Sequence, residues 1–366
     1  MKKHLSVLLA LALILSLALA GCGNAAQSPA SSAPAPSSAP AESAAPAESA
    51  APEAAGGDRE PLEIALLTKT LTNPYFVTNA EYFESYVKAI HPEDNVTVFD
   101  CNQDVSRELS ITEDCITSGY DVIVLTPIDF EGTCTAIQKI VDAGIPCVVS
   151  EMTANINLAD LTVMADNYEA GYLSMQSLGE AMGGSGKMVV FQNSTNPVAR
   201  ERANGRDACL AEKFPDIEVV NVEDGAHTAE KCFEVMSNFL IADPDITGAW
   251  CFQDPNAVGV ASAVRTAGIT GQVKIVGVDG SEELCDLIRA GEAVSSTAQM
   301  VSTINRVMVE SMYELLENGK LDKPNMEIPC LVVDSSVVDT EWVNWADDQP
   351  IKYVDIEEKM KSVGGA

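Results

Sequence analysis

From about residue 61 onward, short runs of β-favouring residues alternate with longer segments in which apolar residues recur at helical spacing. The runs are LEIALL, NVTVF, DVIVL, PCVVS, KMVVF, IEVVNV, ITGAWCF and KIVGV. In the segment Val301 to Asn318, one helical face would carry Ile304, Val307, Met308, Met312, Leu315 and Leu316. Strand–helix–strand alternation without hairpin turns predicts parallel sheets with helices on both faces.

The same tripeptide follows two of these strands. Thr72-Asn73-Pro74 comes after EIALLTKTL, and Thr195-Asn196-Pro197 comes after KMVVFQNS. Asparagine can accept a hydrogen bond from a free N–H of a first helical turn, and proline is tolerated at the first helical position. The repeat predicts two similar lobes that each begin a helix in the same way. Because ligands bind beyond the carboxyl ends of parallel strands, both tripeptides should face one cleft.

The N-terminus has the pattern of a bacterial lipoprotein signal. Two lysines precede an apolar run, residues 5–18, that is too short to span a membrane. Leu19-Ala20-Gly21-Cys22 then resembles a lipobox, so we expect residues 1–21 to be removed and Cys22 to carry a lipid. The alternative is an ordinary signal peptide followed by a chance cysteine.

A low-complexity segment follows. Residues 25–58 are almost all Ala, Pro, Ser, Glu and Gly, and such a stretch cannot bury enough apolar surface to offset its ordering entropy. We therefore interpret residues 22–60 as a lipidated cysteine with a flexible tether.

The chain carries 22 Lys and Arg against 54 Asp and Glu, which gives a formal net charge of -32. A surface this acidic repels phosphate, so we expect no nucleic-acid partner. Nine cysteines beyond Cys22 show no C-x-x-C and no metal-ligand spacing, and the three histidines lie far apart. We expect no metal and no cofactor, and we interpret the cysteines as small buried hydrophobic residues.

The residues that follow the predicted strands are mostly planar hydrogen-bonding groups and aromatic rings. The candidate site residues are Asn73, Tyr75, Phe76, Glu151, Met152, Arg202, His227, Gln253, Asp254, Asp279 and Gln299. Planar amide, carboxylate and guanidinium groups can bridge adjacent hydroxyls in pairs, and aromatic rings suit the C–H faces of a sugar. A hydroxyl buried without a partner costs about 1–3 kcal/mol, so such a set discriminates sharply. It contains no obvious nucleophile with a base.

Several segments resemble, in order, the periplasmic sugar-binding proteins of ABC transporters, the group around the ribose-binding protein. They are TLTNPYFV, LTPIDFEGTCTAIQKIVDAGIPCVV, ADNYEAG, ARERANG, FLIADPDITGAWCFQD, VKIVGVDGS and AVSSTAQ, within about residues 62–334. The resemblance implies the two-lobed α/β fold of type I periplasmic binding proteins, with a parallel sheet flanked by helices in each lobe and three hinge crossings. It implies a first lobe of residues 61–165 with 300–328 and a second of 166–299 with 329–366.

For the first lobe, the resemblance implies that Asn73 and the rings of Tyr75 and Phe76 form its face of the ligand site. Ribose binders carry Asp-Arg where this chain has Glu151-Met152. The change removes hydrogen-bond donors and adds apolar bulk, which argues against ribose itself as the ligand.

For the second lobe, the resemblance implies that Arg202 reaches ring and hydroxyl oxygens and that Asp279 accepts from a pair of hydroxyls. Gln299 would close the cleft at the hinge. His227 stands where ribose binders place an aromatic ring, and Gln253 replaces an asparagine, with the next residue, an aspartate, beside it.

We therefore expect a monomeric, lipid-anchored protein on the outer surface of the cell membrane that captures a monosaccharide or related polyol and delivers it to an ABC import permease. One alternative is a receptor that reports a sugar to a membrane kinase or chemoreceptor. Another is a glycosidase that uses Glu151 with Asp254 or Asp279, for which retaining chemistry needs carboxyls about 5–5.5 Å apart. A sugar-responsive repressor would need a DNA-binding headpiece where this chain has a signal and a tether.

Overall fold

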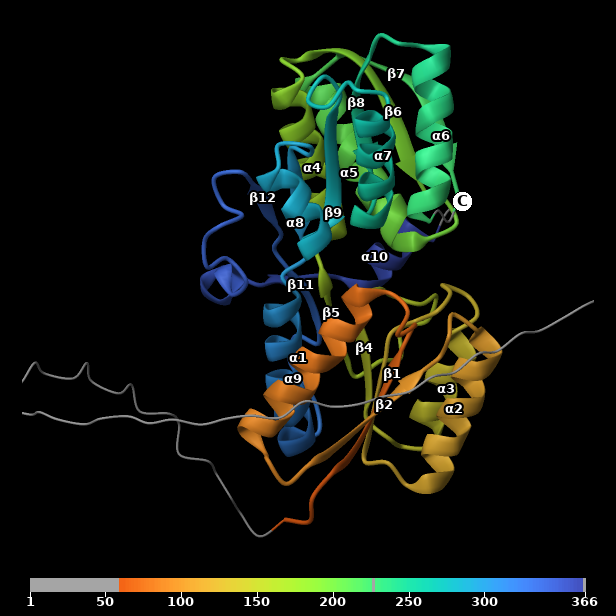
Figure 1. The fold of residues 1–366 in the computed structure, drawn as a ribbon. Coiled ribbons are helices and arrows are strands. Elements are labelled where there is room, and N and C mark those ends of the chain that lie inside the picture. Colours follow the sequence, from red (N-terminus) through yellow and green to blue (C-terminus); the bar gives the residue numbers. More distant parts are fainter. Residues whose placement is uncertain (1–58, 226–227, 365–366) are drawn as a thin grey trace, which may run out of the picture. The chain divides into compact units, whose positions relative to one another are not determined.

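The computed structural model describes residues 59–225 and 228–364, whose strands form two sheets (Figure 1). The predicted signal, Cys22 and residues 23–58 of the predicted tether lie outside the described residues. All eight strand runs predicted from the sequence are strands, and the predicted helix from Val301 to Asn318 is α9 (Val301–Asn318). Within the described ranges no helix is long and apolar enough to cross a membrane.

The first lobe is built on a seven-stranded sheet of order β13-β11-β5-β4-β3-β1-β2. Its strands are β1 (Glu63–Thr68), β2 (Asn95–Asp100), β3 (Val122–Leu125), β4 (Cys147–Ser150), β5 (Leu161–Ala165), β11 (Asn325–Ile328) and β13 (Lys352–Tyr353). Its helices are α1 (Pro74–Ile90), α2 (Val105–Ser118), α3 (Cys134–Asp142) and α9. The alternating side chains of β1 separate the layers, because Ile64 and Leu66 pack with α1 and α9 whereas Ala65 and Leu67 pack with α2 and α3.

The second lobe is built on a six-stranded sheet of order β12-β10-β9-β8-β6-β7. Its strands are β6 (Ser185–Gln192), β7 (Asp216–Asp224), β8 (Ile246–Cys251), β9 (Lys274–Asp279), β10 (Ser295–Ala298) and β12 (Leu331–Asp334). Its helices are α4 (Asn167–Ala181), α5 (Pro197–Lys213), α6 (Ala229–Ala242), α7 (Asp254–Thr266) and α8 (Glu282–Arg289). Trp250 of β8 packs in the layer of α4 and α5, and its neighbours Ala249 and Cys251 pack in the opposite layer.

Each sheet is mostly parallel but carries one antiparallel edge strand, which the sequence pattern did not predict. β12 pairs antiparallel with β10, and β13 pairs antiparallel with β11. β12 follows β11 with no helix between them, and only the short η1 separates β13 from β12, so the strand–helix alternation that predicts a parallel sheet ends at β11. The nine cysteines of the described residues are free and eight of them are buried, which confirms their interpretation as core residues.

The chain passes between the two sheets after β5, after β10 and after β11, and the tail crosses once more from β12 to β13. Residues 329–366 were expected with the second lobe, and this is wrong for β13, which joins the first sheet through Met326↔Tyr353 and Glu327↔Lys352. The physical reason is that β11 would otherwise be an edge strand with unpaired backbone groups. The tail after β12 continues through η1 (Trp345–Asp348) and ends in α10 (Ile356–Val363).

Helices α4 and α5 of the second lobe cross with their backbones in contact. A Cβ atom at Gly171 of α4 would lie 1.9 Å from the carbonyl oxygen of Arg202, and one at Gly205 of α5 would lie 2.0 Å from that of Tyr168. Neither position has room for a side chain, so this packing fixes the backbone of Arg202 against α4.

We predict that Gly171→Ala lowers the free energy of unfolding by about 1–3 kcal/mol, because the added methyl group must push the two helices apart. Urea denaturation monitored by circular dichroism measures the change. The matched control is Asn204→Ala on the exposed face of α5, for which we expect a change within about 0.5 kcal/mol. Equal effects of the two substitutions would contradict the close packing described here.

Candidate ligand site

A cavity of about 560 Å³ lies at the carboxyl ends of strands from both sheets. This is the edge at which open parallel sheets bind ligands. Nine of the predicted site residues line it, namely Asn73, Tyr75, Phe76, Glu151, Met152, Arg202, Gln253, Asp279 and Gln299. Two predicted residues do not appear in its lining. His227 lies outside the described residues, and Asp254 is fully buried elsewhere.

The two Thr-Asn-Pro tripeptides form the same helix start in both lobes. Asn73 caps α1 by accepting from Tyr75 N at 3.0 Å, and Asn196 caps α5 by accepting from Ala199 N at 3.3 Å. A proline follows each cap at the first helical position. Both asparagines line the cavity, and the cap of α1 places Tyr75 and Phe76 beside it, with their rings 5.2 Å apart and nearly perpendicular.

Glu151 follows β4 and is clamped by two side chains from one face of α1. Its Oε1 accepts from Asn79 Nδ2 at 2.6 Å, and its Oε2 accepts from the hydroxyl of Tyr75. Asn79 was not among the candidate residues from the sequence, although it stands four positions after Tyr75 and therefore on the same helical face. Met152, the neighbour of Glu151, adds an almost fully buried thioether to the cavity wall.

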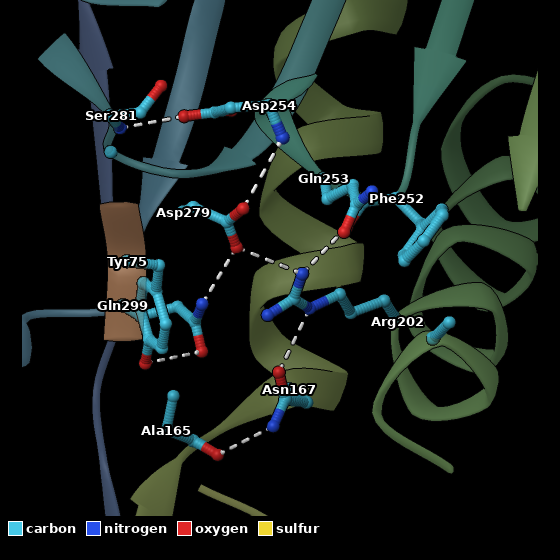
Figure 2. Close-up of polar contacts among 12 residues, drawn as sticks. Tyr75, Ala165, Asn167, Arg202, Phe252, Gln253, Asp254, Asp279, Ser281 and Gln299 are labelled. Carbon is cyan, nitrogen blue, oxygen red and sulfur yellow. Dashed lines mark hydrogen bonds and ion pairs between the residues drawn. The ribbon is translucent and has the colours of Figure 1, made fainter. Parts of the chain in front are cut away.

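Arg202 and Asp279 form a buried ion pair in the second lobe (Figure 2). Arg202 Nη1 donates to Asp279 Oδ1 at 3.2 Å and to the carbonyl oxygen of Phe252 at 2.7 Å, and its Nε donates to Asn167 Oδ1 at 2.9 Å. Among the described residues, Arg202 Nη2 has no hydrogen-bond partner. The guanidinium is thus fixed in position while one of its nitrogen atoms stays available to a ligand.

Gln299 joins the two halves of the site. It follows β10, where the chain leaves the second lobe, and its Nε2 donates to Asp279 Oδ1 at 2.8 Å. Its Oε1 lies 3.3 Å from the hydroxyl oxygen of Tyr75 in the first lobe (Figure 2). The predicted hinge position of Gln299 therefore coincides with a polar contact that links α1 to the end of β9.

Asp254 supports Asp279 and the loop that follows β9. Its Oδ2 accepts from Ser281 N at 2.7 Å, both of its oxygens lie within 2.9 Å of Ser296 Oγ, and its own backbone N donates to Asp279 Oδ2 at 3.4 Å. The expected ligand contact is replaced by a structural one, because the first residue of α7 turns its side chain towards the loop after β9. The neighbour Gln253 does line the cavity, with its Nε2 bonded to Asn256 Oδ1 at 2.7 Å.

Both site carboxylates stand on unusual backbone. Glu151 has φ 70° and Asp279 has φ 140°, a range that L-residues other than glycine rarely adopt. Such conformations cost about 1–3 kcal/mol each and concentrate at functional sites, where the surrounding contacts hold them. At Glu151 the two donors from α1 provide that restraint, and at Asp279 the bonds from Arg202 and Gln299 do so.

Burial makes both carboxylates weaker acids than usual. It raises the pKa of Glu151 to about 7, although the hydrogen bonds from Tyr75 and Asn79 and the nearby charge of Arg202 oppose the shift. Burial also raises the pKa of Asp279, again against the opposing effect of Arg202. Near neutral pH, Glu151 is therefore divided between its protonated and ionised forms.

The hydroxyl of Tyr75 shows which form completes the hydrogen bonds. It faces two acceptors, Glu151 Oε2 and Gln299 Oε1, but carries only one proton. If Glu151 is ionised, it takes that proton and leaves Gln299 Oε1 without a donor from Tyr75. If Glu151 is protonated, it donates to Tyr75, which in turn donates to Gln299. The protonated form gives a continuous chain of donors that ends at Asp279.

Comparison with known proteins matches this chain to a family of binding proteins. Residues 64–321 match the family model described as periplasmic binding protein domain. The ribose import binding protein of Bacillus subtilis is 26% identical over 268 residues, which cover 73% of this chain and 86% of that protein. The D-allose-binding periplasmic protein of Escherichia coli is 26% identical over 285 residues, which cover 75% of this chain and 91% of that protein.

A solved structure shares the fold. An ABC transporter periplasmic solute binding protein from Actinobacillus succinogenes, with bound D-allose, superposes with a TM-score of 0.71 at 26% identity, covering 76% of this chain and 99% of that one. These relatives are binding proteins of import systems and not enzymes. In the part of the chain that the structure describes, no group of three or more His, Cys, Asp or Glu residues is arranged to hold a metal ion.

We predict that Glu151→Gln changes the pH dependence of stability. The folded pKa of Glu151, about 7, exceeds the ordinary 4.5, so its stabilising contribution is complete at low pH and is lost as the pH rises through 7. As the pH rises from about 4.5 to about 7, the free energy of unfolding of the wild type, relative to that of the variant, should fall by about 3 kcal/mol. Glutamine keeps a donor for Tyr75 and an acceptor for Asn79, so it imitates the protonated form.

Chemical denaturation at a series of pH values measures this difference, in which the contributions of acidic groups remote from Glu151 cancel. Parallel profiles for wild type and variant would show that Glu151 titrates in the folded protein as it does in the unfolded chain.

Proposed function

We propose, since the chain belongs to the periplasmic binding protein family, that it is a lipid-anchored extracellular binding protein that captures a monosaccharide or related polyol and delivers it to an ABC import permease. Its relatives supply the class of ligand, because they are named for ribose and D-allose. The lipid on Cys22 would hold the protein at the outer surface of the cell membrane. The tether of residues 22–60 would let the binding domain move away from that surface.

The observation that carries the proposal is the pairing of fixed polar groups with apolar walls in one cavity. Within the described part of the chain, Arg202 Nη2 is available as a donor and Asp279 Oδ2 has one long contact, so each can bond a hydroxyl. The rings of Tyr75, Phe76 and Phe252 offer flat surfaces for C–H groups. A polyol satisfies both kinds of group at once.

The charges in the cavity favour a neutral ligand. The cationic side chains of Lys69 and Arg202 stand against the acidic side chains of Asp279, Glu283 and Glu151, and Glu151 is partly protonated near neutral pH. An anionic or cationic ligand would bring an unmatched charge into a confined site, and burying such a charge is costly. Hydroxyl groups bring no net charge.

Isothermal calorimetry across a panel of pentoses, hexoses and polyols tests the proposal. We expect one or a few members to bind, with a negative heat-capacity change from burial of the ligand between the lobes. Absence of binding across the whole panel would overturn the proposed ligand class. Permease delivery is tested separately, by loss of sugar uptake when the gene is deleted.

We predict that Asp279→Ala weakens sugar binding by at least about 2 kcal/mol, because the ligand hydroxyls lose a charged acceptor and stay buried. Arg202 should keep its place, since it also bonds Phe252 and Asn167. Calorimetry with the sugar found in the panel measures the loss. The control is Glu283→Ala, an exposed acid in the cavity wall, for which we expect little change. Equal affinities for wild type and Asp279→Ala would place Asp279 outside the ligand contacts.

We predict that Cys22→Ala moves the protein from the membrane fraction into the soluble fraction without changing its sugar affinity. The lipid would be attached to the tether and would not contact the binding domain. Fractionation of cells followed by immunoblotting measures the distribution. Unchanged membrane association would indicate a different anchor.

A further inference from the structure

The C-terminal tail returns to both lobes after β12. β13 pairs with β11 of the first sheet, and α10 packs on α5 of the second lobe (Figure 1). Residues 352–363, here called the strap, therefore contact the two lobes directly. The match to the periplasmic binding protein domain ends at residue 321, so the strap lies beyond the matched domain.

Lys359 is the central contact of the strap. Its Nζ bonds Glu201 of α5 and Glu327 of β11, which belong to different lobes. All three side chains are buried, with 9%, 8% and 0% of their surface exposed for Lys359, Glu201 and Glu327. Burial raises the pKa of Glu201 to about 7 despite the nearby ammonium, which Glu201 shares with Glu327. A buried charge cluster of this kind depends on every member being present.

A second lysine extends the cluster to the hinge. Lys352 Nζ lies 3.0 Å from Glu327 Oε2 and 2.8 Å from Asp166 Oδ2. Asp166 is the N-cap of α4 and stands where the chain first passes between the lobes. The strap is thus bonded to the first sheet, to a hinge crossing and to the second lobe.

The strap also contacts the turn of α5 that contains Arg202 of the ligand site. Arg200 Nε donates to the carbonyl oxygen of Val363 at 2.7 Å, and the next residue, Glu201, bonds Lys359. The residue after that is Arg202, which lines the cavity. Two successive contacts from α10 therefore hold the part of α5 that presents the guanidinium to the ligand.

We propose that the strap holds the two lobes at the angle at which the ligand site is complete, and that Lys359 is a positioning residue for Arg202. In this arrangement Tyr75 of the first lobe meets Gln299 and, through it, Asp279 of the second. A rotation of the lobes would have to break the bonds of Lys359 to one side or carry the strap away from the other. The strap thereby stabilises the binding-competent conformation and lowers the cost of closing around a ligand.

The test compares substitutions on one helix. Lys359→Met keeps the length of the side chain and removes the ammonium, Lys359→Arg keeps the charge, and Lys361→Met changes an exposed lysine of α10 as the matched control. Because Lys359→Met leaves Glu201 without its cation and Glu327 with Lys352 alone, a triple variant adds Glu201→Gln and Glu327→Gln, and Lys352 keeps its pairing with Asp166.

We expect Lys359→Met and the triple variant to raise the Kd of the sugar by roughly tenfold, mainly through faster dissociation. This change corresponds to a tenfold decrease in the population of the binding-competent conformation. Lys359→Arg should restore wild-type dissociation and Lys361→Met should preserve it. Stopped-flow fluorescence measures the rates. A role in stability alone would lower the melting temperature of the variants without changing the dissociation rate.

This ligand measurement rests on the proposed function, so a measurement without ligand accompanies it. Small-angle X-ray scattering of the ligand-free full chain should show a larger radius of gyration for Lys359→Met and the triple variant than for wild type and Lys361→Met. Unchanged radii together with unchanged dissociation rates would overturn the proposed role of the strap. If no sugar binds the wild type, the proposed function fails, whereas the scattering comparison still decides the inference about the strap.

Discussion

The carboxylate of Asp279 is the point on which the site depends, because one of its oxygens accepts from both Arg202 and Gln299. A carboxylate this deeply buried is stable only with such partners. Arg202 provides the opposite charge and is itself fixed by a backbone carbonyl and an amide from α4, and Gln299 connects the pair to Tyr75 in the first lobe. The close crossing of α4 and α5, the support from Asp254 and the strap all constrain this same ion pair.

The sequence predicted the positions of eight strands and of helix α9, where local pattern decides them. Runs such as DVIVL and CVVS are buried on both faces and read as strands, and the amphipathic pattern of α9 gave its bounds. β10 is not among the eight predicted strand runs because its sequence, SSTA, is polar and has the composition of a loop. It is a strand because β9 and β12 pair with it on both sides, and such tertiary context overrides propensity. β13 was missed for the same reason, since its pairing with β11 is visible only in the fold.

The site followed from the sequence to the extent that strand ends and helix caps determine it. Asn73 and Asn196 were recognised as caps, and both caps place their helices at the cavity. The sequence could not show which way a side chain turns at such an end. Asp254 follows Gln253 directly, yet it points to Ser281 and Ser296 while its neighbour lines the cavity. Asn79 was missed because a single amide inside an amphipathic helix gives no signal until Glu151 is placed opposite it.

The two lobes begin their site helices with the same cap but contribute different chemical groups to the ligand site. The caps of α1 and α5 have almost the same backbone angles, φ -99° with ψ 123° and φ -93° with ψ 122°. From that common start, the first lobe presents rings and a carboxylate held by neutral donors, and the second presents a carboxylate held by a guanidinium. Protonation of Glu151 leaves the cations of Lys69 and Arg202 opposite the carboxylates of Asp279 and Glu283 in the cavity, even though the whole chain carries a formal charge of -32. The acidic surface therefore opposes anions at a distance, whereas the site itself distinguishes uncharged ligands by the number and direction of their hydroxyl groups.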